Sequence, residues 1–334
     1  MQRLALTILL VFLCTLVGSS VDLSSAGSGR VVHVSTPAQL RKALAAALPG
    51  DDIVLADGVY EGRFAVQASR SGTEGKRVTL RGSRAAVLDG GDVNTGYVLH
   101  LKASYWEVKG ISITNGLKGI MADGVTGVLI DSVKLWSIGE EAIHLRQFSS
   151  HNRIERCEIS GTGLKTPGFG EGIYIGSAKN NWEKHSVGGP DRCDSNVIAY
   201  CRIGPSVAAE CIDIKEGTTG GLIRGNHFDA TGITGANSAD SWMDIKGNGY
   251  LIEGNTGYNP EGSMLRDGFQ VNVAFPGWGN GNLFIKNDCT INAGGYGILV
   301  KLKSSNGEAK DNRVFESNRV KGAGQGLTNI PPAR

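Results

Sequence analysis

The chain has 334 residues and a formal net charge of +2, with 40% hydrophobic and 20% charged residues. This length and composition suffice for one sizeable core. The small net charge predicts no general attraction to nucleic acid, so any acidic ligand must be bound by a local patch. Forty-nine glycines without a Gly-X-Y period exclude a collagen helix, and nine prolines without a polar low-complexity tract argue against disorder.

The N-terminus carries an apolar run of 14 residues, Leu4 to Val17, followed by small residues. A membrane-spanning helix needs about 20 apolar residues, so the run is typical of a secretory signal peptide rather than an anchor. We expect a signal peptide over residues 1–20, a linker over 21–30 and one domain over 31–334. The protein is therefore expected to be secreted and extracellular, without membrane insertion, and monomeric.

The first part of the domain predicts a short strand over residues 31–35 and one amphipathic helix over 36–48. Ser35 or Thr36 can cap this helix, and leucines four residues apart form one apolar stripe, at positions 40, 44 and 48. A helix that covers the first strand of a stack hides an edge that otherwise invites aggregation.

From about residue 100 onward, one short strand pattern repeats. Aligned segments share one column, which reads Ile111, Val133, Cys157, Cys201, Asn226, Asn255, Asn287 and Asn318. Most steps are 22 to 32 residues, which suits one coil of a solenoid, and the 44-residue step after Cys157 indicates a coil with a long loop. Inward asparagines at a bend can pair backbone groups and each other. The sequence thus predicts an all-β, single-domain, right-handed parallel β-helix.

Five cysteines follow the signal peptide, so at least one is unpaired, and none has zinc-binding spacing. Cys157 and Cys201 occupy consecutive positions of the column. They could form a disulfide or remain buried free thiols, and the sequence leaves both alternatives open.

A second strand of each coil carries the polar chemistry. Residues two apart share a face, so the apolar side chains point inward and two columns point outward. The first outward column comprises His144, Tyr174, Asp213, Asp244 and Gln270, and the second comprises Arg146, Gly176, Lys215, Lys246, Asn272 and Lys301. Acidic residues also precede these strands, at Glu141, Glu171, Glu210 and Asp267.

These outward groups suit the cleavage of a uronic-acid polysaccharide by β-elimination. The reaction needs a cation to neutralise the substrate carboxylate, a base for the adjacent proton and an acid for the leaving oxygen. A Ca²⁺ ion held by carboxylates suits the first role, and a lysine with a lowered pKa suits the second.

Two N-terminal segments, PGDDIVLADGVY at 49–60 and SGTEGKRVTL at 71–80, resemble the pectin-lyase-like β-helix superfamily. The segment from Glu210 to Lys215 is similar to the alginate lyase and chondroitinase B group, polysaccharide lyase family 6. In that family a calcium-binding Glu lies five residues before a catalytic Lys base, which implies these roles for Glu210 and Lys215. The family's second calcium Glu falls on Ala208, and its catalytic Arg falls on Lys246.

The leading hypothesis is an extracellular lyase with Lys215 as base and Lys246 as acid or carboxylate neutraliser. Arg146 would bind a substrate carboxylate, and His144, Tyr174 and Gln270 would contact substrate. The expected Ca²⁺ ligands are Glu210, Asp213, Asp244 and Glu171. One alternative is a glycoside hydrolase that uses Asp213 and Asp244. Another is a non-catalytic carbohydrate-binding or cell-wall protein.

Overall fold

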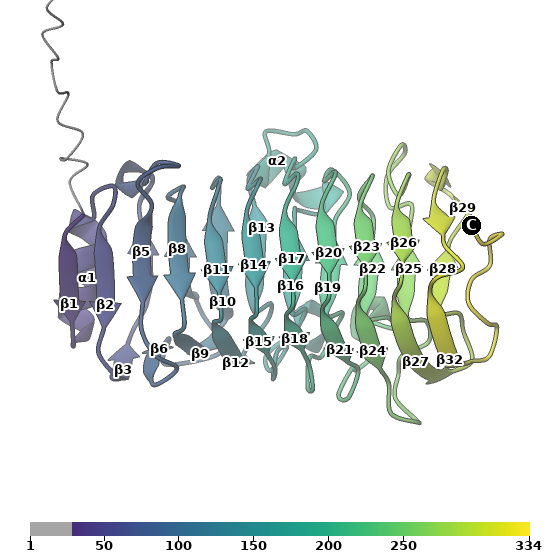
Figure 1. The fold of residues 1–334 in the computed structure, drawn as a ribbon, viewed down its shortest axis with the longest axis horizontal. Coiled ribbons are helices and arrows are strands. Elements are labelled where there is room, and N and C mark those ends of the chain that lie inside the picture. Colours follow the sequence, from purple (N-terminus) through teal and green to yellow (C-terminus); the bar gives the residue numbers. More distant parts are fainter. Residues whose placement is uncertain (1–28) are drawn as a thin grey trace, which may run out of the picture.

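The structure, a computed structural model, describes residues 29–334. The expected signal peptide and most of the expected linker lie outside these residues. The described chain winds into one elongated stack of coils, and each full coil adds one strand to each of three parallel sheets (Figure 1). Between residues 29 and 334, no helix has the length and apolar character needed to cross a membrane.

Three sheets, here called A, B and C, form the sides of the stack. Sheet A contains β1 (Val31–Val34), β2 (Asp52–Leu55), β5 (Val78–Arg81), β8 (Trp106–Lys109), β11 (Leu129–Asp131), β14 (Arg153–Glu155), β17 (Val197–Ala199), β20 (Leu222–Arg224), β23 (Leu251–Glu253), β26 (Leu283–Ile285) and β31 (Arg313–Val314). Sheet B contains β3 (Gly58–Glu61), β6 (Ala86–Asp89), β9 (Ser112–Gly116), β12 (Lys134–Ile138), β15 (Glu158–Ile159), β18 (Arg202–Ile203), β21 (His227–Asp229), β24 (Thr256–Tyr258), β27 (Asp288–Ala293) and β32 (Arg319–Ala323). Sheet C contains β4 (Phe64–Val66), β7 (Tyr97–Leu101), β10 (Lys118–Asp123), β13 (Ile143–Arg146), β16 (Ile173–Ile175), β19 (Ile212–Ile214), β22 (Met243–Ile245), β25 (Phe269–Val271) and β28 (Ile298–Val300).

A helix closes the N-terminal end of the stack, as expected. Helix α1 (Pro37–Ala46) begins after Thr36, whose side chain accepts a hydrogen bond from the Gln39 amide at 3.2 Å. Leu40 and Leu44 are buried. The predicted stripe is too long, because the helix ends at Ala46 and Leu48 is 49% exposed. Pro49 disfavours helical geometry at the residue before it, which explains the earlier end.

The predicted asparagine column is confirmed as a ladder of buried hydrogen bonds. The Oδ1 atom of Asn255 accepts from the backbone amide and the Nδ2 group of Asn226, at 2.9 and 3.0 Å. Asn287 and Asn318 repeat this pattern on the next two coils. Each amide therefore pairs backbone groups at the bend between sheets A and B, where sheet pairing is interrupted.

A second set of asparagines, not singled out from the sequence, stacks where each coil enters sheet A. Asn152 bonds Asn196 at 3.1 Å, and Asn282 bonds Asn312 at 3.0 Å. Each of these residues immediately precedes a strand of sheet A. An asparagine directly before each of these strands is the feature of the sequence from which this second ladder could have been predicted.

The cysteine alternatives are resolved in favour of free thiols. Cys157 and Cys201 are buried, and no disulfide joins any of the five cysteines among residues 29–334. The Sγ atoms lie 3.6 Å from the Ile130 carbonyl oxygen for Cys157 and 3.7 Å from the Ile154 carbonyl oxygen for Cys201. These thiols occupy the two positions of the column between Val133 and the first asparagine, Asn226.

Replacing Asn255 with Ala tests the ladder. The change removes the acceptor of the buried Asn226 backbone amide and the side-chain donor to the Ile223 carbonyl, both on the preceding coil. We expect this loss to lower the free energy of unfolding by about 2–4 kcal/mol. Chemical denaturation measures this loss, with the exposed Asn94→Ala as the matched control. Equal stability of the two variants would contradict the role given to the ladder.

Candidate active site

Sheet C brings the first outward column together in the predicted register. His144 pairs with Tyr174 on the next strand, and Tyr174 pairs with Asp213. The column continues from Asp213 through Asp244 to Gln270. The alternate residues, such as Ile212 and Ile214, are fully buried in the core. The period-two alternation of each strand thus places these polar groups on one face.

The second outward column follows the same strands. The backbone amides of Lys215, Lys246 and Lys301 each donate to a carbonyl of the preceding coil, at 2.8 to 3.0 Å. The residues therefore continue the sheet's register just beyond β19, β22 and β28. Neighbouring members of the column are about one strand spacing apart, roughly 4.8 Å.

Loops bury much of this face, which the sequence did not predict. On one side, the short 3-10 turns η2 (Pro167–Phe169) and η4 (Ala236–Ser238) meet through a 3.1 Å hydrogen bond from Asn237 to the Gly168 carbonyl. On the other side, the long loop carries η3 (Lys179–Asn181) and helix α2 (Trp182–His185). Lys179 Nζ donates a hydrogen bond to the Ala274 carbonyl at 3.0 Å. This bond joins the long loop to the segment that follows β25.

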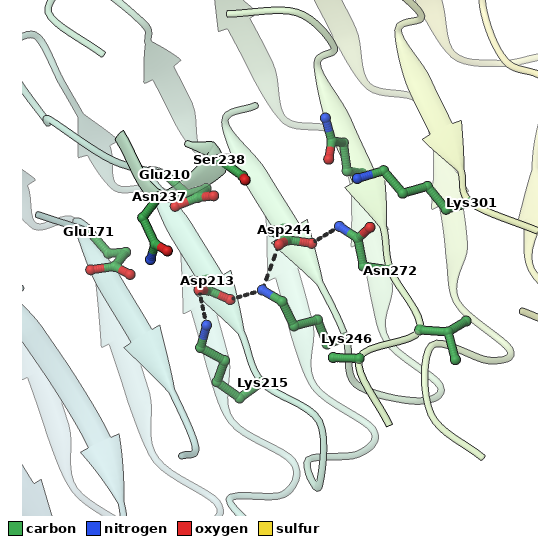
Figure 2. Close-up of a pocket in the computed structure, with 13 residues that line it drawn as sticks. Glu171, Glu210, Asp213, Lys215, Asn237, Ser238, Asp244, Lys246, Asn272 and Lys301 are labelled. Atoms are coloured by element: carbon green, nitrogen blue, oxygen red, sulfur yellow. Dashed lines mark hydrogen bonds and ion pairs between the residues drawn. The ribbon is translucent and has the colours of Figure 1, made fainter. Parts of the chain in front are cut away.

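A chain of ion pairs forms the centre of the site (Figure 2). Asp213 binds Lys215 at 2.5 Å through one oxygen and Lys246 at 2.9 Å through the other. Lys246 also binds Asp244 at 2.5 Å, and Asn272 donates to the other oxygen of Asp244. The Asp213 side chain is only 4% exposed, and both lysine side chains are 13% exposed. These charges therefore compensate one another in a largely desolvated environment.

The expected lowering of the lysine pKa is wrong for this arrangement. Burial alone lowers the pKa of Lys215, but its attraction to Asp213 is stronger in sum and raises that pKa above the ordinary value. The pKa of Lys246 is raised for the same reason, by Asp213 and Asp244. Burial raises the pKa of Asp213, but the two lysines outweigh burial and hold it below the usual range.

Three buried carboxylates lie beside the ion pairs. Glu171, Glu210 and Asp213 each offer an oxygen, and these atoms lie within 4.8 Å of one another. One oxygen of Glu171 is buried without any hydrogen-bond partner. Burial and neighbouring carboxylates raise the pKa of Glu171, and they raise that of Glu210 to about 8. This surplus of carboxylate oxygens, one of them unpaired, has the chemistry of a site for a hard metal ion.

Asp244 does not join this acidic cluster, although the sequence placed it among the metal ligands. It is not among the three carboxylates whose oxygens lie within 4.8 Å of one another. It pairs instead with Lys246 and Asn272. Three of the four expected ligands are therefore brought together.

Three other residues were predicted from the sequence to contact substrate, namely His144, Tyr174 and Gln270, and each contacts other residues of the protein. Tyr174 lies beneath Lys215, whose Nζ is 4.7 Å from the ring centroid, and its ring lies 4.4 Å from that of His144. His144 itself is buried and donates from Nε2 to the Gly176 carbonyl at 2.9 Å, at the start of the long loop. Gln270 donates to Asp240 and Asp267 at 2.8 and 3.0 Å.

Arg146 belongs to a separate polar cluster on the N-terminal side. Its guanidinium binds Asp123 at 2.6 Å, and His100 binds the same carboxylate at 2.7 Å. Arg146 is absent from the pocket that contains the two lysines. Arg146, which was predicted to bind a substrate carboxylate, therefore lies outside the pocket at the central ion pairs.

An open pocket of about 360 Å³ lies over the ion pairs and extends along the stack from β16 to β28. Its lining includes nine residues named from the sequence as outward or acidic candidates, namely Glu171, Glu210, Asp213, Lys215, Asp244, Lys246, Gln270, Asn272 and Lys301. Asn237, Ser238, Val273 and Ala274 come from loops, whose path the strand pattern does not predict.

Comparisons with known proteins agree with this geometry. An alginate lyase from Paenibacillus sp. str. FPU-7 is 39% identical, with a TM-score of 0.84 over 91% of this chain and 99% of that protein. A pectate lyase is 16% identical, with a TM-score of 0.65 over 85% of this chain and 80% of that one. A family 6 alginate lyase is 18% identical, with a TM-score of 0.53 over 85% of this chain and 42% of that one. No protein-family model and no curated protein sequence matches the chain.

The three stacked parallel sheets and the polar face of sheet C define a right-handed β-helix of the pectin-lyase-like class, as the sequence predicted. A sequence identity of 39% over nearly the full length of both chains shows a closer relationship than a shared fold alone. The chain belongs to the same family as the Paenibacillus alginate lyase, and it is a polysaccharide lyase. Its likeness to the family 6 lyases is one of fold.

The cluster around Asp123 predicts a dependence of stability on pH. Burial alone raises the pKa of Asp123, but His100 and Arg146 outweigh burial and depress it strongly. The carboxylate therefore contributes stability above its unfolded pKa of about 4, and this contribution is lost as the pH falls towards the folded value. We expect Asp123→Asn to cost about 3 kcal/mol at pH 7.

Thermal and chemical unfolding at several pH values measure this effect. The difference between the wild type and Asp123→Asn should shrink steadily below about pH 4. A difference that is constant across the acidic range would show that ionisation of Asp123 is not its source.

Proposed function

We propose that this lyase is exported and, acting as a monomer, cleaves a uronic-acid polysaccharide, with alginate as the first substrate to test. The observation that carries this proposal is the pocket of about 360 Å³ lined by Lys215 and Lys246, two cations whose side chains are only 13% exposed. The 39% identity to an alginate lyase supports the substrate, and the apolar run of residues 4–17 supports export.

The proposed reaction removes the proton beside the uronate carboxyl group and releases the glycosidic oxygen on the neighbouring carbon. As the proton leaves, negative charge builds up at the substrate carboxylate and must be stabilised. Cationic groups do this most effectively in a site from which water is excluded. Lys246 lies between Asp213 and Asp244, where its ammonium group can bind the carboxylate or protonate the leaving oxygen.

Lys215 is proposed as the base. Its ammonium group lies 2.5 Å from Asp213, which is therefore the nearest acceptor for the proton that Lys215 must lose. This transfer gives a neutral amine and a neutral acid, and it runs against the raised pKa of Lys215 and the lowered pKa of Asp213. The amine then accepts the substrate proton, and the leaving oxygen receives a proton from Lys246. The ring of Tyr174 lies beside Lys215, with its centroid 4.7 Å from Nζ.

A Ca²⁺ ion is proposed at Glu171, Glu210 and Asp213. The unpaired oxygen of Glu171 and the closeness of the three carboxylates favour a hard, oxygen-binding cation. When bound, such an ion would supply positive charge for the substrate carboxylate. The protein's own contribution is to hold these oxygens together in a buried corner of the pocket.

The hydrolase alternative is less well supported. It requires Asp213 and Asp244 to act as separate acid and base on either side of a sugar. Lys246 instead bridges the two carboxylates, at 2.9 and 2.5 Å, and Asn272 binds Asp244.

Replacement of Lys215 by Ala tests the assignment of the base. We expect at least a hundredfold lower kcat, because a positioned general base contributes about 10²- to 10⁴-fold. The ultraviolet absorbance of the unsaturated product follows the reaction on alginate and other uronate polymers. Lys321→Ala, which removes an exposed lysine of sheet B, is the charge-matched control and should retain wild-type activity. A folded Lys215→Ala protein with near wild-type kcat would remove Lys215 from the mechanism.

Removal of metal tests the acidic cluster. Treatment with a chelator should lower activity and the melting temperature, and added Ca²⁺ should restore both, because ligand binding stabilises the folded state. Glu171→Gln should weaken the Ca²⁺-dependent rise in melting temperature, while the exposed Glu261→Gln should leave it unchanged. Full activity in chelator together with no thermal shift would argue against a metal site.

A further inference from the structure

Lys301 is the last cation of the second outward column, and it stands apart from the central ion pairs. It follows β28 and donates from its backbone amide to the Val271 carbonyl at 3.0 Å, so it keeps the register of Lys215 and Lys246. It lines the same pocket as those two lysines. Figure 2 shows it on the far side of Asn272 from Lys246.

The surroundings of Lys301 leave its charge uncompensated. Lys215 and Lys246 are flanked by aspartates of the first outward column, whereas the corresponding neighbour of Lys301 is Leu299. Within the described part of the chain, Lys301 forms no ion pair within 4.0 Å, and it is exposed. Asp240 is near enough to feel its charge but is hydrogen-bonded to Gln270.

The spacing of the column matches a chain of sugars that lies along the stack. Lys246 and Lys301 are separated by two strand spacings, roughly 10 Å, with the neutral Asn272 between them. One sugar of an extended 1,4-linked uronate polymer is about as long as one strand spacing. Successive sugars of such a polymer alternate in orientation, so every second carboxylate faces the same wall.

We propose that Lys301 is a specificity-determining residue that binds the carboxylate of the uronate two sugars away from the one held at Lys246. This inference rests on the proposed function, because it places a uronate polymer in the pocket. The uncharged Asn272 then lies beside the intervening sugar, whose carboxylate points away. Lys301 thereby favours chains long enough to reach from the reacting bond to the end of the pocket.

Kinetics on oligouronates of three to six sugars test this role. For Lys301→Ala acting on the hexamer we expect KM to rise about five- to tenfold, with kcat within about twofold of the wild type, because one charge-assisted contact to bound substrate is lost. The gain in kcat/KM that the wild type shows with increasing chain length should disappear. Lys301→Arg should preserve most of that gain, and Lys321→Ala should match the wild type throughout.

Salt and direct binding separate this proposal from the proposed function. The difference between wild type and Lys301→Ala should shrink at high ionic strength, because exposed charges are screened. If no uronate polymer is cleaved, the proposed function fails, and calorimetric binding of the hexamer to wild type and Lys301→Ala still reports on the subsite. Equal hexamer affinity of these two proteins, or a lower kcat with unchanged KM, would overturn the role of Lys301.

Discussion

Hydrogen bonding between successive coils is the constraint on which the rest of this structure depends. Every coil must pair its backbone with the next, both along the sheets and at the bends, because unpaired groups in the interior are costly. The asparagines at 226, 255, 287 and 318 satisfy the bends and fix which residues are neighbours on adjacent coils. Residues some 30 positions apart in sequence thereby become one row of functional groups.

That register places many charged side chains on the outer face of sheet C. The loops that cover this face then bury these side chains from solvent. Burial of carboxylates is unfavourable unless cations or hydrogen bonds compensate them. Asp213 obtains two lysines, whereas Glu171 keeps an unpaired oxygen. The site therefore contains one compensated group of charges and one acidic corner with spare oxygens, which is a suitable division between proton transfer and charge neutralisation.

Strand positions and facing directions were predictable because a period of two and a coil-length repeat are local properties of the sequence. The predicted pairs from His144 through Asp213 to Gln270 all occur. Burial of the site was not predictable, because it depends on how η2, η4 and the long loop fold over sheet C. The direction of the shift in the lysine pKa was also predicted wrongly. The spacing of the residues shows that Asp213 and Lys215 are close, but it does not show that they form an ion pair. Arg146 was placed in the right column but is held by Asp123.

The central claim is that the chain cleaves a uronate polymer by elimination at the Lys215 and Lys246 pocket. The most direct test is the mass spectrum of the products formed from a defined oligouronate in water labelled with heavy oxygen. Elimination adds no water, so the product masses should sum to the substrate mass, one product should carry a double bond, and no label should enter. Products that together contain one added, labelled water would contradict the account and identify a hydrolase instead.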